Sequence, residues 1–348
     1  MSDYIIKEAI LNEEKEKIRN FLSTLNLQYE NGINYSLYMV DSYGNIIATI
    51  SLSDYIIKCL AVSNEHEDEN LESELINKLI EKLKNDNKFY YLVFSLIKYE
   101  SLFINLGFKK IASTDKTIIL EYGSPSIDVV LDRLKNKIET TLDCKLDSSR
   151  VCSIVINADP FTNGHLSLVE EGIVRRYDCI LVFVVSDNKG FFNEKERLSL
   201  AYVSLLPYDN VIVVPSTRYI ISEMTFPNCY LDNNKSNNDL SSYDKNEEWA
   251  KLDALIFRDY FMEKLNISKR FLGSEIDHYM VQYNNVLKEV LGDKVEIIDR
   301  IKLGDKPIRA KDVREHIING NMEEVQRLVP RGSWMFYKQI LERYKHLN

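Results

Sequence analysis

The first third of the chain alternates between short apolar runs and segments whose apolar residues recur every three or four positions. The first pattern predicts strands and the second predicts helices. Strands are expected at 35–40, 46–51, 55–62, 90–95 and 117–122, and helices at 13–25, 71–83 and 99–106. We therefore expect residues 1–122 to form a self-contained α/β domain.

After residue 150 the strand-like runs become more uniformly apolar. Such runs are typical of parallel strands that are buried on both faces of a sheet. They cover 151–156, 179–185, 211–214, 270–272 and 295–301, with helical spacing in segments between them. Strands that alternate with helices predict a Rossmann-like parallel sheet with right-handed crossovers, so residues 150–348 are expected to form a second α/β domain.

The segment between the two halves interrupts the alternation of strand-like and helical runs. Residues 123–126 read Gly-Ser-Pro-Ser and 127–142 have helical spacing, so 123–149 is predicted to be a linker that contains one helix. In the second half, the almost purely polar segment 232–248 is predicted to be a loop.

Composition narrows the class of protein. The 348 residues are 45% hydrophobic and 28% charged, and they contain neither a membrane-length apolar run nor a signal-peptide pattern. The net charge of −9 argues against a general nucleic-acid-binding protein. Five cysteines without a CxxC pair indicate a reducing compartment rather than disulfides or a zinc site. We therefore expect a cytoplasmic protein that binds neither nucleic acid nor membrane.

Candidate chemistry is concentrated where the first strand of the second domain ends. The strand 151–156 breaks at Asn157–Pro160, and the Thr-Asn-Gly-His segment Thr162–His165 then opens a helix. Unpaired N–H groups and the helix dipole favour anions there, and α/β sheets bind nucleotides at the carboxyl ends of their strands. The alternative for the histidine is a helix cap or a packed surface residue.

This stretch resembles the (H/T)xGH signature of the nucleotidyltransferase superfamily, with Thr162, Gly164 and His165 in the signature positions. On that resemblance Asp159, Phe161 and Gly164 are expected to bind the nucleotide. His165 and Thr162 are suited to hold α-phosphate oxygens, His165 as a donor whose charge forms readily near pH 7.

Two further segments match the same superfamily. Lys189 stands where these enzymes place a lysine that contacts substrate and phosphate, and 308–314 (IRAKDVR) stands where they carry ISxTxxR over the ATP phosphates. Arg314 is kept, whereas Arg309 and Lys311 replace hydroxyl residues. Because two cations oppose the helix dipole, we expect both to point at the β- and γ-phosphates. The alternatives are that both face solvent or a carboxylate, that Lys189 is an ordinary loop lysine and that Arg314 makes a structural salt bridge.

The order of elements in the first domain, with Leu-Gly-Phe at 106–108, resembles the GNAT acetyltransferase fold. GNAT enzymes bind the pyrophosphate of acetyl-CoA on a Gly-rich turn that opens the long helix. Here the segment 63–71 (SNEHEDENL) has no glycine and carries four carboxylates, which repel a pyrophosphate. We therefore expect a GNAT-like domain that does not bind acetyl-CoA.

The whole chain resembles the citrate lyase ligase family in its domain order and in the stretches 219–231, 251–275, 282–291 and 329–334. The resemblance implies that acetate and ATP form acetyl-AMP and pyrophosphate, after which the prosthetic-group thiol of the citrate lyase acyl-carrier subunit takes the acetyl group. ATP and Mg²⁺ are the implied cofactors, with Mg²⁺ on phosphate oxygens and water because no carboxylate cage is evident. Lys189 and Arg314 are suited to neutralise the departing pyrophosphate.

Other functions stay open at this point. Arg218 stands where the family tends to have a smaller residue, which leaves room for a different acid or carrier. A scaffold protein that kept the folds and lost turnover is one alternative. A nucleotidyltransferase with another acceptor is the second.

Overall fold

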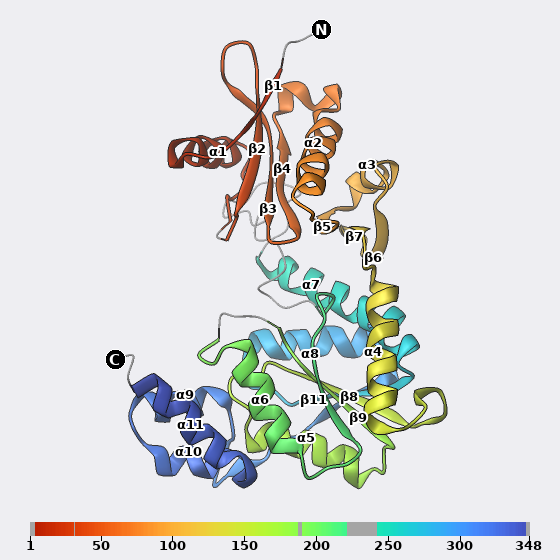
Figure 1. Cartoon of the computed structure of the whole chain (residues 1–348), viewed down its shortest axis with the longest axis vertical. Helices are drawn as coiled ribbons and strands as arrows, with labels where there is room; N and C mark the ends of the chain where they lie inside the picture. The colour runs from red at the N-terminus through yellow and green to blue at the C-terminus, as the bar shows by residue number, and fades with distance from the viewer. Residues whose placement is uncertain (1–3, 31, 187–189, 221–241, 346–348) are drawn as a thin grey trace. The chain divides into compact units, whose positions relative to one another are not determined.

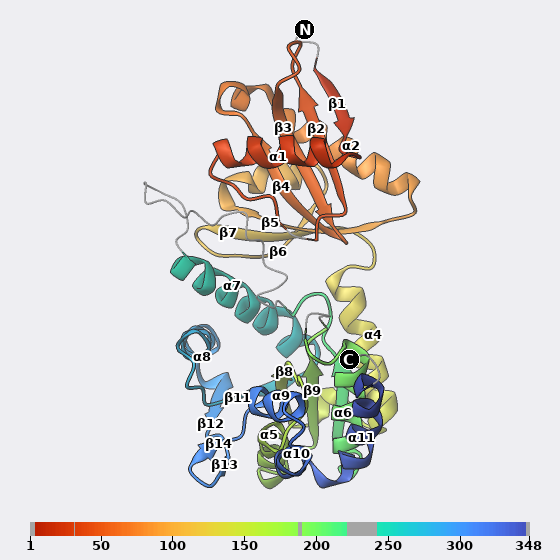
Figure 2. The ribbon, with the colours of Figure 1, turned by 90° about the vertical axis from the view of Figure 1, so that its left-hand side faces the viewer.

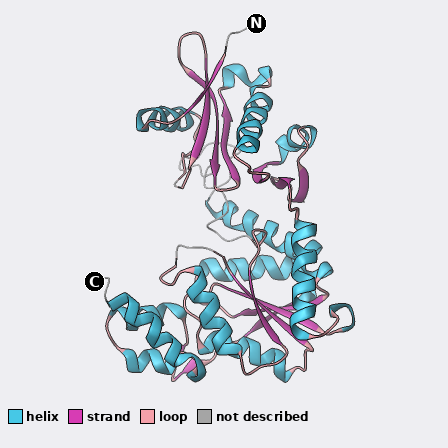
Figure 3. Cartoon of the chain, viewed as in Figure 1, coloured by secondary structure: helices cyan, strands magenta, loops and turns pink. Residues whose placement is uncertain are grey.

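The structure, a computed structural model, describes residues 4–30, 32–186, 190–220 and 242–345. It divides into two compact units, one of Met1–Ser126 with Glu223–Leu252 and one of Ile127–Ser222 with Asp253–Asn348. Each unit has its own main sheet and its own helices (Figure 1, Figure 3). The predicted α/β class of both halves is confirmed.

The sheet of the first unit has seven strands in the order β1-β2-β3-β4-β5-β7-β6. These are β1 (Ile5–Glu8), β2 (Tyr35–Val40), β3 (Ile46–Ser53), β4 (Ile56–Val62), β5 (Tyr90–Leu96), β6 (Lys109–Ser113) and β7 (Thr117–Gly123). The helices are α1 (Asn12–Thr24), α2 (Leu71–Asn85) and α3 (Glu100–Asn105), with 3₁₀ helices η1 (Asn64–Glu69) and η2 (Ile97–Tyr99). Neighbouring strands are antiparallel except β4 and β5, which are parallel.

Alternation along β2 supplies two cores, one on each face of this sheet. Leu37 and Met39 pack in the core that includes α2, and Tyr38 and Val40 pack in the core that includes α1. Figure 2 shows α1 crossing the strands on one face. Because successive strand residues point to opposite faces, one apolar strand can serve both cores.

The main sheet of the second unit has five parallel strands in the order β10-β9-β8-β11-β12. These are β8 (Val151–Ile156), β9 (Cys179–Val184), β10 (Val211–Pro215), β11 (Ile267–Gly273) and β12 (Val295–Ile298), and β13 (Lys302–Leu303) and β14 (Lys306–Pro307) form a separate small hairpin. The α-helices are α4 (Ile127–Leu142), α5 (Asn163–Val174), α6 (Glu194–Leu205), α8 (His278–Leu291), α9 (Ala310–Ile318), α10 (Met322–Leu328) and α11 (Trp334–Lys345). Helix α7 (Ser242–Ile256) belongs to the first unit up to Leu252 and to the second from Asp253. Shorter helical turns are η3 (Leu146–Ser148), the π-helix η4 (Phe257–Met262), η5 (Gly292–Lys294) and η6 (Arg331–Ser333).

Both faces of this parallel sheet are covered. One core contains Ile154 of β8 and Val182 of β9 together with residues of α5, α6 and α11. The next residue of β9, Phe183, points to the other face and meets Phe257 and Phe261 of η4 at ring-centroid distances of 6.3 and 5.7 Å. Burial on both faces explains why these strands are almost continuously apolar.

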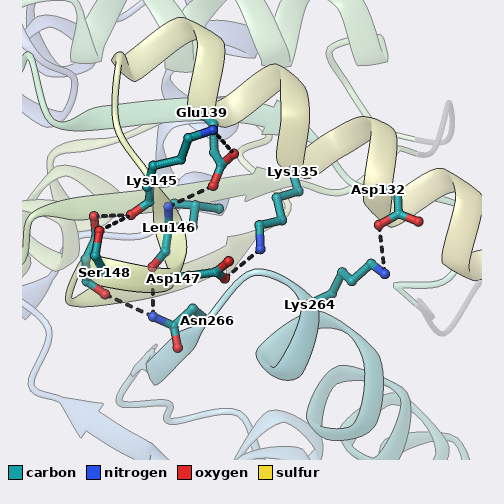
Figure 4. Close-up of polar contacts among 10 residues, drawn as sticks. Asp132, Lys135, Glu139, Lys145, Leu146, Asp147, Ser148, Lys264 and Asn266 are labelled. Atoms are coloured by element: carbon teal, nitrogen blue, oxygen red, sulfur yellow. Dashed lines mark hydrogen bonds and ion pairs between the residues drawn. The ribbon is translucent and has the colours of Figure 1, made fainter.

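The helix expected in the linker, α4, is held by residues of the second unit (Figure 4). Glu139 accepts a hydrogen bond from the backbone N–H of Leu146 at 2.9 Å, and Asn266 donates to the carbonyl of Leu146 at 2.7 Å. Lys264 forms an ion pair with Asp132 at 2.7 Å. These contacts attach α4 to the segment that leads into β11.

Several elements differ from their predicted bounds, and two of these differences bear on the second half of the chain. The last strand of the sheet ends at Ile298 rather than at residue 301, and the polar segment predicted to be a loop contains the start of α7, at Ser242. The later residues of α7 explain the second difference, because Trp249 and Leu252 are buried and give the helix an apolar side. Among the described residues, no helix is long and apolar enough to cross a membrane.

Candidate nucleotide-binding site

The strand order of the second unit reverses at β8. The chain runs from β8 to β9 and β10 on one side and then returns to β11 and β12 on the other. In open parallel sheets, ligands bind outside the carboxyl ends of the strands at such a reversal. The candidate site is therefore formed by the segments that follow β8, β11 and β12.

The loop after β8 is organised by Asp159, whose side chain is buried. Its carboxylate accepts hydrogen bonds from the backbone N–H groups of Phe191 and Phe192 at 3.0 and 2.8 Å. Gly190 lies against the same carboxylate, because a Cβ at this position would be 2.9 Å from the Asp159 carboxyl carbon. Asp159, predicted to bind nucleotide, thus joins the two loops that follow β8 and β9.

His165 is held by the residue that caps its own helix. The backbone N–H of Thr162 donates to His165 Nδ1 at 3.0 Å, and the Thr162 hydroxyl oxygen lies 3.1 Å from the same nitrogen. Since the amide hydrogen can only be donated, Nδ1 must be an acceptor, which places the imidazole proton on Nε2. Phe161 is fully buried and packs its ring 5.5 Å from the imidazole. Its side chain therefore supports His165, and the expected contact of Phe161 with the nucleotide stays a prediction.

The charge state of His165 also differs from the prediction. Burial lowers the pKa of His165 to about 4, and the positive charge of Arg300 contributes to the lowering. The imidazole is therefore neutral at pH 7, whereas its charge was expected to form readily there. It offers an Nε2–H donor without a positive charge.

Gly164 fits a close approach of two segments. A Cβ at this position would lie 3.0 Å from the carbonyl oxygen of Ile308, just before α9. Asn163, the first residue of α5, donates to the carbonyl of Arg327 at 3.0 Å. The start of α5 is thus packed against the segments around α9 and α10.

The three cations of 308–314 all contact protein oxygens. Arg314 donates to the carbonyl of Asp159 and lies 3.5 Å from its carboxylate. Arg309 makes a two-pronged contact with Asp312, three residues further along. Lys311 is 3.9 Å from Glu315, with 68% of its side chain exposed. Arg309 and Lys311 thus pair with carboxylates one helical turn away. That both point at the β- and γ-phosphates of ATP stays a prediction.

Arg300, which the sequence patterns did not single out, is the cation that acts on His165. Its Nε donates to the carbonyl of Ser274 at 2.6 Å, its backbone N–H donates to the Ser274 hydroxyl at 3.1 Å, and its guanidinium donates to Glu275. Burial raises the pKa of Glu275, while the neighbouring guanidinium opposes that rise. The signal that could have identified Arg300 is its position just after the last strand, at the same sheet edge as His165.

Two remaining questions concern the predicted lysine, Lys189, and the side chains that could hold a metal ion. Lys189 lies outside the described residues. Within the described ranges, no group of three or more His, Cys, Asp and Glu side chains is arranged to hold a metal ion. The site described here consists of the α5 N-terminus, neutral His165 and Arg300.

Comparison with known proteins adds sequence relatives. A family profile described as the citrate lyase ligase C-terminal domain matches residues 151–337. The curated citrate (pro-3S)-lyase ligase of Escherichia coli is 26% identical over 340 residues, which cover 95% of this chain and 92% of that protein. The Klebsiella pneumoniae enzyme of the same name is 26% identical over 350 residues, covering 97% of each chain.

Solved structures that align with about a third of the chain include acetyltransferases. A GNAT-family acetyltransferase from Staphylococcus aureus is 15% identical, with 35% of this chain and 100% of that one covered at a TM-score of 0.30. An acyl-CoA N-acyltransferase from Pseudomonas aeruginosa is 12% identical, with 35% and 99% covered at a TM-score of 0.30.

Proposed function

The chain belongs to the citrate lyase ligase family, and on this premise we propose that it activates acetate with ATP and acetylates the thiol of a citrate lyase acyl-carrier subunit. In the first step an acetate oxygen forms a bond to the α-phosphorus while the bond from that phosphorus to the bridging oxygen breaks. Acetyl-AMP and pyrophosphate result. In the second step the carrier thiol, as thiolate, attacks the acetyl carbon, and AMP leaves with the oxygen.

The observation that supports the first step is that the neutral donor His165 and the cation Arg300 both lie at the edge of the sheet where the strand order reverses at β8. Because Nδ1 of His165 accepts from Thr162, Nε2–H is the group available to a phosphate oxygen. The N–H groups at the start of α5 and their dipole favour the same anion. Displacement at phosphorus requires positioning and charge stabilisation more than a protein nucleophile, and these groups supply both.

The remaining residues either neutralise phosphate charge or hold the loop after β8. Arg300 is the cation proposed to meet the pyrophosphate. Asp159 and Arg314 also hold the loop after β8 through their contacts with protein atoms. The role of Arg314 in neutralising the pyrophosphate remains part of this proposal. Mg²⁺, when bound on phosphate oxygens and water, would neutralise part of the triphosphate charge.

Acetate-dependent exchange of labelled pyrophosphate into ATP is the direct test. The full chain should catalyse exchange with acetate and Mg²⁺ present and should not do so without acetate. Exchange that instead requires a phosphorylated acceptor would indicate a nucleotidyltransferase with another product. Absence of exchange under all these conditions would favour a scaffold protein and would contradict the proposal.

A further inference from the structure

Helix α8 is tied to strand β11 by two successive residues that the proposed chemistry does not use. Tyr283 contacts a buried polar cluster near the middle of β11, and Asn284 contacts the residue at which β11 ends. Both side chains therefore connect α8 to the strand that borders the sheet reversal.

Tyr283 hydrogen-bonds both to a carboxylate, which can only accept, and to a guanidinium, which can only donate. Its hydroxyl donates to Asp253 at 2.8 Å and accepts from Arg270 at 3.0 Å. Arg270 and Asp253 are each 1% exposed, lie 3.3 Å apart, and the guanidinium stacks 4.3 Å from the Phe257 ring. Buried charges are costly to leave unpaired, so this cluster sets the position of α8 along β11.

Asn284 connects α8 to the end of β11, next to the residue that Arg300 contacts. Its amide donates to the carbonyl of Gly273 at 3.0 Å, and the Asn284 side chain is buried. The next residue, Ser274, accepts from Arg300 through both its carbonyl and its hydroxyl. The Asn284 contact and the Arg300 contacts are thus on adjacent residues, Gly273 and Ser274.

We infer that Asn284, itself held by Tyr283, is a positioning residue that sets Arg300 beside His165. It acts through the end of β11 and does not touch the reacting atoms. The expected loss of kcat rests on the proposed function, whereas the expected change in the pKa of His165 does not.

The test compares Asn284→Ala with Asn285→Ala in the full chain. Asn285 is the exposed neighbour on α8, so both changes replace an asparagine in the same helix and only the first removes the bond to Gly273. The pKa of His165 is measured by NMR on histidine-labelled protein, with its signal identified by its loss in His165→Ala. Acetate-dependent pyrophosphate exchange gives kcat and KM.

In Asn284→Ala the pKa of His165 should rise above about 4, because burial, the larger cause, stays while the contribution of Arg300 is reduced. We expect kcat to fall about tenfold to a hundredfold, with KM for acetate within about twofold of the parent value. Asn285→Ala should match the parent in both measurements. Equal His165 titration and equal kcat in the two variants would overturn the inference, as would a loss of thermal stability without a change in that pKa.

Two further outcomes are informative. If the parent protein shows no acetate-dependent exchange, the proposed function fails, and the His165 titration still decides the positioning role. If Asn284→Ala does not fold, Tyr283→Phe takes its place, because it removes only the hydroxyl that reaches Asp253 and Arg270. It should shift the pKa of His165 in the same direction, and an unchanged value would refute the inference.

Discussion

The two units each place a helix after a strand of the sheet, but the two helix starts have opposite electrostatics. In the first unit β4 leads through η1 into α2, whose first turn carries Glu72 and Glu74. In the second unit β8 leads into α5, whose first turn, all of it described, carries no acidic side chain. The first-turn charges therefore disfavour an anion at the α2 start, whereas no acidic side chain of the first turn opposes one at the α5 start.

Side-chain contacts strengthen the difference. At the α2 start, Glu69 accepts hydrogen bonds from Tyr4 and His66, which lower its pKa and keep it ionised. At the α5 start, His165 is neutral with its proton on Nε2, and the positive charge of Arg300 acts on it. Topology thus supplies a possible phosphate site in both units, and the residues of the first turn decide whether it can be used.

The largest expected effect is at His165. His165→Ala should lower acetate-dependent exchange by about a hundredfold or more, because a preorganised donor to the transition state is lost. His66→Ala, at the other helix start, should leave exchange unchanged. Initial exchange rates and thermal unfolding of both variants provide the measurement. Near-parental exchange in folded His165→Ala would make the Thr-Asn-Gly-His segment a structural turn.

Removal of Arg300 should have the next largest effect. We expect Arg300→Ala to lower exchange by roughly tenfold or more, since a charge that meets the pyrophosphate is lost. Lys311→Ala is the matched control, because that lysine is exposed and faces Glu315. Exchange rates over a range of ATP concentrations test both. A larger loss in Lys311→Ala would return the phosphate role to the α9 start.

Adding an acid to the α5 start should make it resemble the α2 start. Asn163→Glu should weaken ATP binding about tenfold through repulsion between like charges. The new carboxylate should also favour the free helix by about 0.3–1 kcal/mol. Asn163→Gln, which also alters the contact with the Arg327 carbonyl but adds no charge, is the control. Equal ATP affinity in the two variants, measured by calorimetry, would show that phosphate does not lie at this helix start.

Acidification should destabilise the two helix starts in different pH windows. His165 has a lowered pKa in the folded chain, so the unfolded chain takes up its proton first, and stability should fall between about pH 6.5 and 4. The lowered pKa of Glu69 contributes stability that is lost only below its ordinary value of 4.5. Urea midpoints between pH 7.5 and 4 should therefore fall less in His165→Gln than in the parent. Parallel curves would contradict a lowered pKa for His165.

The last prediction is that the chain does not bind acetyl-CoA. Acetyl-CoA should give no binding heat with the full chain at concentrations up to about millimolar, because the acidic α2 start repels its pyrophosphate. ATP titrated into the same preparation is the positive control. A micromolar dissociation constant for acetyl-CoA would remove the contrast between the two helix starts.

Local pattern in the sequence was sufficient for the strand-to-helix connection at the site. The apolar run of β8, the break before Thr162 and the helical spacing after His165 are all set by neighbours in the chain. The missing glycine and the four carboxylates before α2 are equally local, so the contrast between the helix starts was visible in the sequence. Neighbouring residues set backbone preference and local charge, and both features depend on these.

Tertiary structure decided the properties that depend on distant residues. Arg300 meets Ser274 because β11 and β12 are parallel and in register at Gly273 and Ile298. The neutral state of His165 follows from burial and from Arg300, 135 positions away in the numbering of the chain. The carboxylate partners of Arg309 and Lys311 were likewise set by the fold, because α9 places Asp312 and Glu315 one turn away. Charge type can be read from sequence, but solvent exposure and partner distance, which determine pKa and pairing, are set only when the sheet and its helices pack.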